Sequence, residues 1–175
     1  SAIPGLEMWY DGTDLNGDGT TDSGYSLGDA VNSWSDKSGN GYHMTKQNDP
    51  TWASHNGLGV VNFDGDDSLY STNWWGGGDE FSMFSVARYT HDNPSYRVIS
   101  DRQNFDFDFG FNNGHMQKWR LREWVTNIAN GKDTLFHLHS ANINSSDQAN
   151  TFYHGTQVGT VNSNGAHDTD YTPRQ

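Results

Sequence analysis

The stretch Phe105-Asp106-Phe107-Asp108-Phe109-Gly110-Phe111 alternates in character along its whole length, and a second alternating run covers residues 116–125. Successive side chains of a β-strand point to opposite faces, so the four Phe share one face and the two Asp share the other. Asn112-Asn113-Gly114 separates the runs and places Gly114 where a hairpin loop needs a left-handed residue. We therefore predict an antiparallel hairpin with a three-residue loop.

The register of this hairpin follows from matching residue types across the two strands. With a three-residue loop, the two strands pair apolar residues with each other on one face and opposite charges on the other. Both faces therefore favour the same register. The four expected pairs are Phe107–Trp119, Phe105–Leu121, Asp108–Lys118 and Asp106–Arg120.

Short strand signals recur along the rest of the chain. We expect strands at 60–63, 69–72, 81–89, 97–100 and 134–141, and a last hairpin of 151–153 with 156–160. His154-Gly155 between these last two strands suits a type I′ turn. Residues 1–57 look loop-rich, with a short helical turn near residues 26–34.

The composition of the chain supports the same fold class. Glu, Lys, Leu and Ala are scarce, whereas Asp, Asn, Gly, Ser and Thr are abundant, and this balance favours turns and strands over helices. Aromatic residues make up 14% of the chain, which excludes a disordered polymer. We predict one all-β domain over residues 1–175, built as a β-sandwich or barrel of short strands.

The charge of the chain limits its partners. The formal net charge is −12 at pH 7, and such a surface repels phosphate backbones, so nucleic acid is excluded as a partner. No apolar run approaches the roughly 20 residues of a membrane span. The sequence contains no Cys, so neither a disulfide framework nor thiolate chemistry is expected.

Three stretches resemble the concanavalin A-like lectin/glucanase superfamily, in its laminin-G-like jelly-roll branch. They are Gly5-Leu6-Glu7-Met8-Trp9-Tyr10-Asp11, the Val31–Gly41 stretch VNSWSDKSGNG and the Val61–Leu69 stretch VNFDGDDSL, followed by the apolar run 81–87. The resemblance implies an antiparallel jelly-roll β-sandwich and a place in secreted or surface-exposed proteins of bacteria or phages. Members of this superfamily continue with further strands past the position of Gln175. We therefore expect either a fragment of a longer domain or protein, or a sheet edge completed by a neighbouring protein chain.

The residues from Asp14 to Asp22 form an acidic loop that predicts a calcium site. They read Asp14-Leu15-Asn16-Gly17-Asp18-Gly19-Thr20-Thr21-Asp22, with oxygen donors at positions 1, 3, 5 and 9 and Gly at position 6. The expected ligands are Asp14, Asn16, Asp18, the Thr20 carbonyl and Asp22, completed by water or another carboxylate. Tyr25 replaces the Glu of an EF-hand, so this is an EF-like loop with a structural role. The alternative is a solvated Asp/Gly turn.

A second acidic turn, Asp64-Gly65-Asp66-Asp67, offers another possible ion site. The simpler interpretation, a polar turn between two strands, is the one that we favour here.

Catalysis finds no support in the sequence. Glycoside hydrolysis usually needs two carboxylates about 5–10 Å apart, and the three Glu residues are isolated from other acids at strand spacing. Asp106 and Asp108 share a strand face, but their expected partners Lys118 and Arg120 make a structural role the better interpretation. His137 and His139 also share a face, where a transition metal site competes with cross-strand hydrogen bonding.

A candidate ligand surface lies in Asn73-Trp74-Trp75-Gly76-Gly77-Gly78-Asp79. Adjacent strand residues point to opposite faces, so one of the two Trp should point away from the core and offer a ring on which a sugar can stack. Asn73 and Asp79 would then bond sugar hydroxyls. The alternative, that both rings pack over the end of the sandwich, has equal weight.

Together these features predict a non-catalytic carbohydrate-binding or adhesion module, stabilised by calcium, whose partner is a glycan or polysaccharide. The first alternative is a structural or protein-interaction domain of a cell-surface or virion assembly. The second is a relative of the glycoside hydrolases. We expect a secreted or extracellular location.

Overall fold

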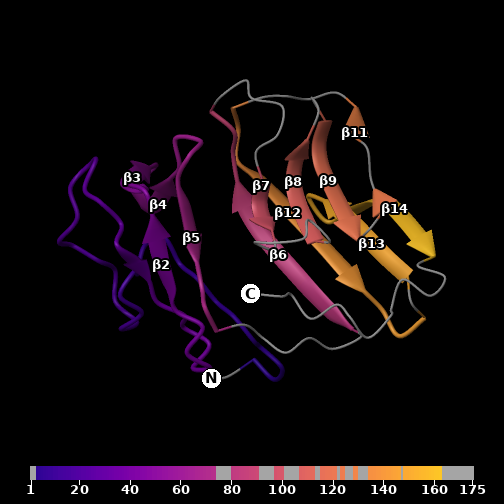
Figure 1. Cartoon of the computed structure of the whole chain (residues 1–175), viewed down its shortest axis with the longest axis horizontal. Helices are drawn as coiled ribbons and strands as arrows, with labels where there is room; N and C mark the ends of the chain where they lie inside the picture. The colour runs from indigo at the N-terminus through magenta and orange to yellow at the C-terminus, as the bar shows by residue number, and fades with distance from the viewer. Residues whose placement is uncertain are drawn as a thin grey trace. The chain divides into compact units, whose positions relative to one another are not determined.

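The computed structural model describes residues 3–73, 80–90, 97–100, 107–112, 115–121, 123–124, 128–129, 134–146 and 148–162. The chain divides into two compact units, Ser1–Trp75 (unit 1) and Gly76–Gln175 (unit 2). Throughout the described residues the secondary structure is strand, turn and loop without a helix (Figure 1). The predicted all-β class is confirmed, and the antiparallel sheets are consistent with a β-sandwich. That residues 1–175 form one domain stays a prediction.

Unit 1 contains five strands in two small antiparallel sheets. The first sheet has the order β1-β2-β5 and the second pairs β3 with β4. The strands are β1 (Ser33–Trp34), β2 (Met44–Gln47), β3 (Thr51–His55), β4 (Leu58–Asn62) and β5 (Ser68–Tyr70). The strands expected at 60–63 and 69–72 are thus present with slightly different bounds, whereas β1, β2 and β3 were missed in the region expected to be loop-rich.

The short helical turn expected near residues 26–34 is wrong. Ser26 and Asp29 instead close a tight turn, in which the Ser26 N–H donates to the Asp29 carboxylate at 2.7 Å and the Asp29 N–H donates to the Ser26 carbonyl at 3.0 Å. Gly28 within this turn has φ +90°, a conformation that Gly adopts at little cost and that ends any helical path. Ala30 then forms a bridge with Thr51.

Two glycines allow a loop to approach the β3–β4 hairpin closely in unit 1. A Cβ on Gly12 would lie 2.6 Å from the Gly59 carbonyl oxygen, and a Cβ on Gly59 would lie 2.4 Å from the Gly12 carbonyl oxygen. Both contacts are with backbone, which cannot rotate away as a side chain can. Only Gly fits at these two positions without displacing the chain.

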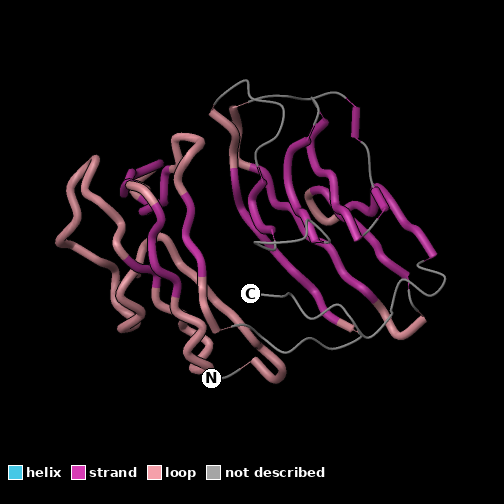
Figure 2. The backbone as a smooth tube through the Cα atoms, viewed as in Figure 1, coloured by secondary structure: helices cyan, strands magenta, loops and turns pink. Residues whose placement is uncertain are grey.

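The core of unit 1 is small, and loops make up most of this unit (Figure 2). Leu15 and Val31 are fully buried within it, at 1% and 0% exposure, and Pro50 is fully buried as well. Leu15 and Val31 are held through their backbones, because the Ser35 N–H donates to the Leu15 carbonyl and the Val31 N–H donates to the Pro50 carbonyl, each at 2.8 Å. A core of this size leaves much of the order of unit 1 to hydrogen bonds.

One sheet of unit 2 has four strands in the order β14-β13-β12-β6 (Figure 1). The strands are β6 (Phe81–Ala87), β12 (His137–Ile143), β13 (Gln148–Tyr153) and β14 (Thr156–Asn162). These strands confirm the expected elements at 81–89 and 134–141 in position, though not in exact bounds. One face of β12 is buried, since His137, His139, Ala141 and Ile143 are each less than 8% exposed.

The β13–β14 hairpin confirms the predicted turn. His154 and Gly155 have φ angles of +48° and +79°, and two successive left-handed residues are the requirement of a type I′ turn. Tyr153 pairs with Thr156 across it. A pairing irregularity between Thr151 and Phe152 accompanies this turn.

The second sheet of unit 2 contains the predicted Phe-rich hairpin. It has the order β10-β9-β8-β7, and β11 also pairs with β9. The strands are β7 (Arg97–Ser100), β8 (Phe107–Asn112), β9 (His115–Leu121), β10 (Glu123–Trp124) and β11 (Ile128–Ala129). The antiparallel pairing of β8 with β9 and the strand at 97–100 are therefore confirmed.

The register predicted for this hairpin is wrong by two residues. Phe107 pairs with Leu121 and Asp108 with Arg120, where Trp119 and Lys118 were expected. Asn112 pairs with His115, which leaves two residues between the strands, and a register shift lies between Gly110 and Asn112. Because the residue pattern of these strands repeats every two positions, a slip of two still pairs apolar with apolar residues and Asp108 with a base. The expected partners Phe105 and Asp106 lie outside the described residues.

In the described part of the chain, no helical segment has the length and apolar character needed to cross a membrane.

Candidate functional site

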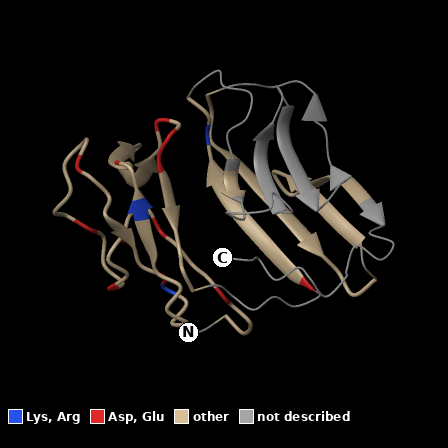
Figure 3. Ribbon diagram, viewed as in Figure 1, with Lys and Arg blue, Asp and Glu red and all other residues tan. Residues whose placement is uncertain are grey.

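Every acidic residue of unit 1 that the structure describes lies outside the strands (Figure 3). The predicted calcium loop lies in one of these segments outside the strands, and its side-chain oxygens accept hydrogen bonds from backbone N–H groups of the same loop. Asp14, only 2% exposed, accepts from Gly17, Asp18 and Gly19 at 2.8, 3.1 and 2.9 Å. The other acceptors are Asn16 Oδ1 from Asp18 at 2.9 Å, Asp18 Oδ1 from Thr20 at 2.8 Å and Asp22 Oδ2 from Leu15 at 2.6 Å. These bonds fold the loop back on itself.

A positive charge reaches this loop from Lys37. Its Nζ lies 2.6 Å from Asp14 Oδ2 and 3.2 Å from Asp11 Oδ2, and its side chain is 12% exposed. The ammonium also lies 4.7 Å from the centre of the Trp9 ring, where a cation is attracted to the ring face. The hydrogen bond between Lys37 and Asp14 lowers the pKa of Asp14 and raises the pKa of Lys37. Lys37 was not predicted from the sequence as part of this loop. The only signal for Lys37 in the sequence was that it is one of few bases among many acids.

The predicted calcium ligands are close in sequence, but the carboxylates do not converge on one point. In the described residues, the only three acidic or histidine side chains whose ligand atoms all lie within 4.8 Å of one another are Asp64, Asp66 and Asp67. Asp14 meets the Lys37 ammonium, which neutralises charge that a cation would otherwise offset. The calcium ligand set Asp14, Asn16, Asp18, Thr20 and Asp22 stays a prediction.

Asp36 organises the segment that follows β1 and ties it to Trp9. It is 6% exposed, and its carboxylate accepts the N–H of Trp9 at 2.9 Å, the N–H and hydroxyl of Ser38 at 2.9 and 2.7 Å, and the N–H of Tyr42 at 3.1 Å. Burial alone would raise the pKa of Asp36, but these hydrogen bonds outweigh it and hold the pKa below its usual range. Asp36 is therefore an ionised structural centre of unit 1.

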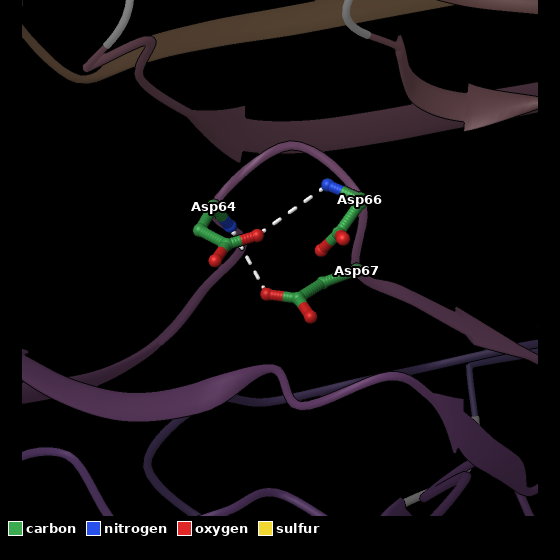
Figure 4. A group of neighbouring side chains, drawn as sticks. All are labelled: Asp64, Asp66 and Asp67. Atoms are coloured by element: carbon green, nitrogen blue, oxygen red, sulfur yellow. Dashed lines mark hydrogen bonds between the residues drawn. The ribbon is translucent and has the colours of Figure 1, made fainter.

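The three carboxylates of Asp64, Asp66 and Asp67 gather in the β4–β5 turn (Figure 4). The Asp64 N–H donates to Asp67 at 3.1 Å, and the Asp66 N–H donates to Asp64 at 3.4 Å. Asp67 also accepts the Asp49 N–H at 2.8 Å, which joins this turn to the β2–β3 turn. Hydrogen bonding and repulsion from Asp64 raise the pKa of Asp66. The exposed turn thus has a structural explanation as a link between two loops.

The predicted ligand surface of Asn73, Trp74, Trp75 and Asp79 is described only at Asn73. The Asn73 carbonyl accepts the Ser71 hydroxyl at 2.6 Å, and its side chain is exposed. Trp74, Trp75 and Asp79 lie outside the described residues. Their role as a sugar-stacking surface stays a prediction.

The four-stranded sheet of unit 2 presents an apolar surface that the sequence reasoning missed. Phe84 and Val86 of β6 are 72% and 67% exposed, and Leu138 of β12 is 38% exposed. The register pairs Val86 with Leu138 and Phe84 with Ser140, so the three apolar side chains share one face. The sequence of residues 81–87 already indicated such a surface, because apolar residues occupy both faces of this strand. The apolar residues of one face had to be exposed unless another element covered them.

Beside these apolar residues runs a row of amide side chains. Asn150 donates from Nδ2 to Asn142 Oδ1 at 3.0 Å, and Gln157 donates from Nε2 to Asn150 Oδ1 at 3.1 Å. Asn142, Asn150 and Gln157 belong to β12, β13 and β14, so the row crosses three neighbouring strands. We name Phe84, Val86 and Leu138 with this amide row the outer face of the sheet. It combines an exposed aromatic ring with amide donors and acceptors.

The opposite face of the same sheet holds a group of imidazole rings. His137 Nδ1 lies 2.9 Å from His154 Nε2, and the Tyr153 hydroxyl also bonds His137 Nδ1. His139 is 1% exposed; its burial, followed by repulsion from His137 and His154, lowers its pKa to about 4. His139 is therefore neutral at neutral pH. The sequence pattern placed His137 and His139 on one face but did not point to His154.

Comparison with known proteins identifies no relative of this chain: no family model, no curated protein and no solved structure matches it.

Proposed function

We propose that this chain is a non-catalytic carbohydrate-binding or adhesion module, built as a concanavalin A-like jelly-roll sandwich and acting in a secreted or surface-exposed protein. One observation carries the proposal: the outer face sets Phe84, at 72% exposure, beside hydrogen-bonded amides. An exposed aromatic ring beside side-chain amides is the chemistry expected of a surface that binds a sugar. The sequence resemblance to the lectin superfamily supports the same proposal.

The outer face suits a sugar because a pyranose ring has an apolar C–H face and a rim of hydroxyls. An exposed aromatic ring packs against the C–H face, and side-chain amides donate to and accept from the hydroxyls. Within the amide row, Asn150 donates to Asn142, and Gln157 donates to Asn150. The row itself leaves the Asn142 NH₂ group and the Gln157 carbonyl for a ligand. Asn73, Trp74, Trp75 and Asp79 remain a second proposed part of the ligand surface.

We expect Phe84→Ala to weaken glycan binding by about tenfold, which is the effect of losing one stacked aromatic ring. A glycan array selects the ligand, and titration of that ligand with wild type and variant gives the two affinities. Leu27→Ala is the matched control, because Leu27 is a comparably exposed apolar residue of unit 1 at 79%, and it should leave affinity unchanged. Trp74→Ala and Trp75→Ala test the second surface in the same titration. Absence of binding across the array would refute the proposal.

Calcium stabilisation is part of the proposal, and its support is the spacing of oxygen donors from Asp14 to Asp22. A ligand that binds only the native state raises the free energy of unfolding, by about 2.7 kcal/mol at a hundredfold excess over its Kd. We therefore expect excess chelator to lower the Tm and added Ca²⁺ to restore it. Magnesium at the same concentration is the control, because its rigid octahedral demand suits this loop poorly. A melting curve indifferent to chelator would contradict the site.

A second candidate function is that of a protein-interaction domain in a surface or virion assembly. The contiguous apolar side chains of Phe84, Val86 and Leu138 favour it, because exposed apolar patches often mark protein interfaces. Sedimentation analysis separates the two functions: self-association that Phe84→Ala abolishes, without glycan binding, supports the interaction domain. A glycoside hydrolase relative remains the weakest candidate, and hydrolysis of a polysaccharide would be its test.

A further inference from the structure

Three side chains converge around the β13–β14 turn of unit 2. β12 supplies His137, the last residue of β13 supplies Tyr153, and the turn supplies His154. The Tyr153 hydroxyl lies 2.5 Å from His137 Nδ1, and His154 Nε2 lies 2.9 Å from the same nitrogen. His137 is 7% exposed, whereas His154 is exposed at the turn. The group is thus anchored at one side and open to solvent at the other.

Hydrogen bonds alone cannot satisfy all three polar atoms of His137, Tyr153 and His154. A neutral imidazole nitrogen carries either one proton or one lone pair. His137 Nδ1 therefore cannot make a full hydrogen bond with both the Tyr153 hydroxyl and His154 Nε2, although both lie within bonding distance. A cation between the three atoms would accept a lone pair from each and remove this competition.

The three ligand atoms lie somewhat closer together than they would around a metal ion. Metal–imidazole bonds are about 2.0–2.1 Å long, so two nitrogens on a tetrahedral ion lie about 3.4 Å apart. The two imidazole nitrogens are 2.9 Å apart and the Tyr153 oxygen lies 2.5 Å from His137 Nδ1, so rotation of the exposed His154 ring and of the Tyr153 ring must widen both separations to admit an ion. Imidazole favours zinc, copper and related ions over calcium, which requires oxygen.

The turn gives an independent reason to look for a function at His154. Three non-glycine residues of the described chain have positive φ: Asn48, Asn56 and His154. Asn is the residue that the first position of a type I′ turn favours, and the chain uses it in the turn of Asn56 and Gly57, while the left-handed residue Asn48 is also Asn. His at the third departs from the best local choice, and such departures concentrate at functional sites.

We propose that His137, Tyr153 and His154 form a binding site for one divalent transition metal ion of the zinc and copper class. The two imidazoles supply neutral nitrogen ligands, Tyr153 releases its hydroxyl proton to solvent and binds as tyrosinate, and water completes the shell on the exposed side. This site shares no residue with the acidic loop of unit 1 or with the proposed glycan surface, so the proposal does not rest on either.

The test uses the tag-free full chain, stripped of metal and titrated with zinc against a chromogenic zinc chelator. Wild type should withhold one equivalent of zinc from the chelator. His154→Asn should weaken zinc binding by at least about tenfold without lowering the Tm of the metal-free protein, because Asn-Gly suits the turn. His55→Asn is the matched control outside the group and should bind zinc like wild type.

Copper gives a second readout that a purely structural role would not produce. A tyrosinate ligand to Cu²⁺ produces a visible charge-transfer band, which wild type should show and Tyr153→Phe should lose. The proposal is overturned if wild type withholds no zinc, if His154→Asn binds zinc as tightly as wild type, or if the copper complex lacks the tyrosinate band.

Discussion

Asp36→Ala is expected to lower the free energy of unfolding by about 4 kcal/mol, the largest effect of any substitution considered for unit 1. The substitution removes four hydrogen bonds to one buried carboxylate. The N–H groups of Trp9, Ser38 and Tyr42 would lose their acceptor, and an unsatisfied buried donor costs more than the net worth of the bond. Urea unfolding followed by tryptophan fluorescence measures the loss.

The pH dependence of stability gives a second signature of Asp36. Its pKa is lowered in the folded chain, so its contribution is present above the unfolded pKa of about 3.9 and is lost as pH falls through the lower folded value. Wild type should therefore lose stability progressively as the pH falls below about 5. Asp36→Asn cannot titrate at this position, so its stability should fall less steeply over that range.

The matched control for Asp36 is Asp49→Ala. Asp49 also pairs with a side chain, since Lys46 Nζ lies 2.7 Å from its carboxylate, but its own side chain is 83% exposed. Exposed pairs of this kind contribute little, so the control should unfold like wild type. Equal unfolding of Asp36→Ala and Asp49→Ala would show that the carboxylate of Asp36 does not organise unit 1.

Lys37→Met is expected to destabilise the chain by about 3 kcal/mol when measured in chelator. The variant keeps an apolar stem of similar length but removes the ammonium that lies 2.6 Å from Asp14 and 3.2 Å from Asp11. Asp14 is then a buried carboxylate without its cation, and breaking such a pair costs more than the pair contributes. Lys46→Met, which removes an exposed lysine pair, is the control.

Calcium should partly restore the stability of Lys37→Met, because a divalent ion can replace the missing positive charge at Asp14. The rise in Tm on adding Ca²⁺ should therefore be larger in the variant than in wild type. If calcium restores nothing in the variant, the loop uses Lys37 as its only cation and the calcium proposal fails. If Lys37→Met is as stable as wild type in chelator, the ion pair has no structural role.

The Phe-rich hairpin shows what alternation can and cannot predict. The alternation of residues 105–111 and of residues 116–125 predicted two antiparallel strands, and β8 and β9 are there. The register was wrong by two residues because the pattern repeats with that period, so the pairs Phe107–Leu121 and Phe107–Trp119 satisfy it equally. The loop length and the shift near Gly110, which decide between them, have no periodic signal.

The acidic loop and the imidazole cluster also combine features that the sequence predicts with contacts that it does not. The oxygen spacing from Asp14 to Asp22 was visible in the sequence, and the hydrogen bonds within that loop are local. Lys37 reaches the loop from 23 positions beyond Asp14, and no local pattern predicts which base closes on which acid. The cluster of His137, Tyr153 and His154 forms only when the fold brings His154 to His137. These two residues are 17 positions apart in the sequence.

The sequence alone therefore determined the properties that depend on near neighbours: the all-β class, the alternating strands, the His154-Gly155 turn and the donor spacing of the acidic loop. Each follows from backbone preferences and from side-chain periods of a few residues. Only the tertiary structure decided the register of β8 and β9, the ion pair of Lys37 with Asp14, and the exposed outer face at Phe84. These depend on which distant segments come together, because burial and charge pairing are set by contacts that no short stretch of sequence contains.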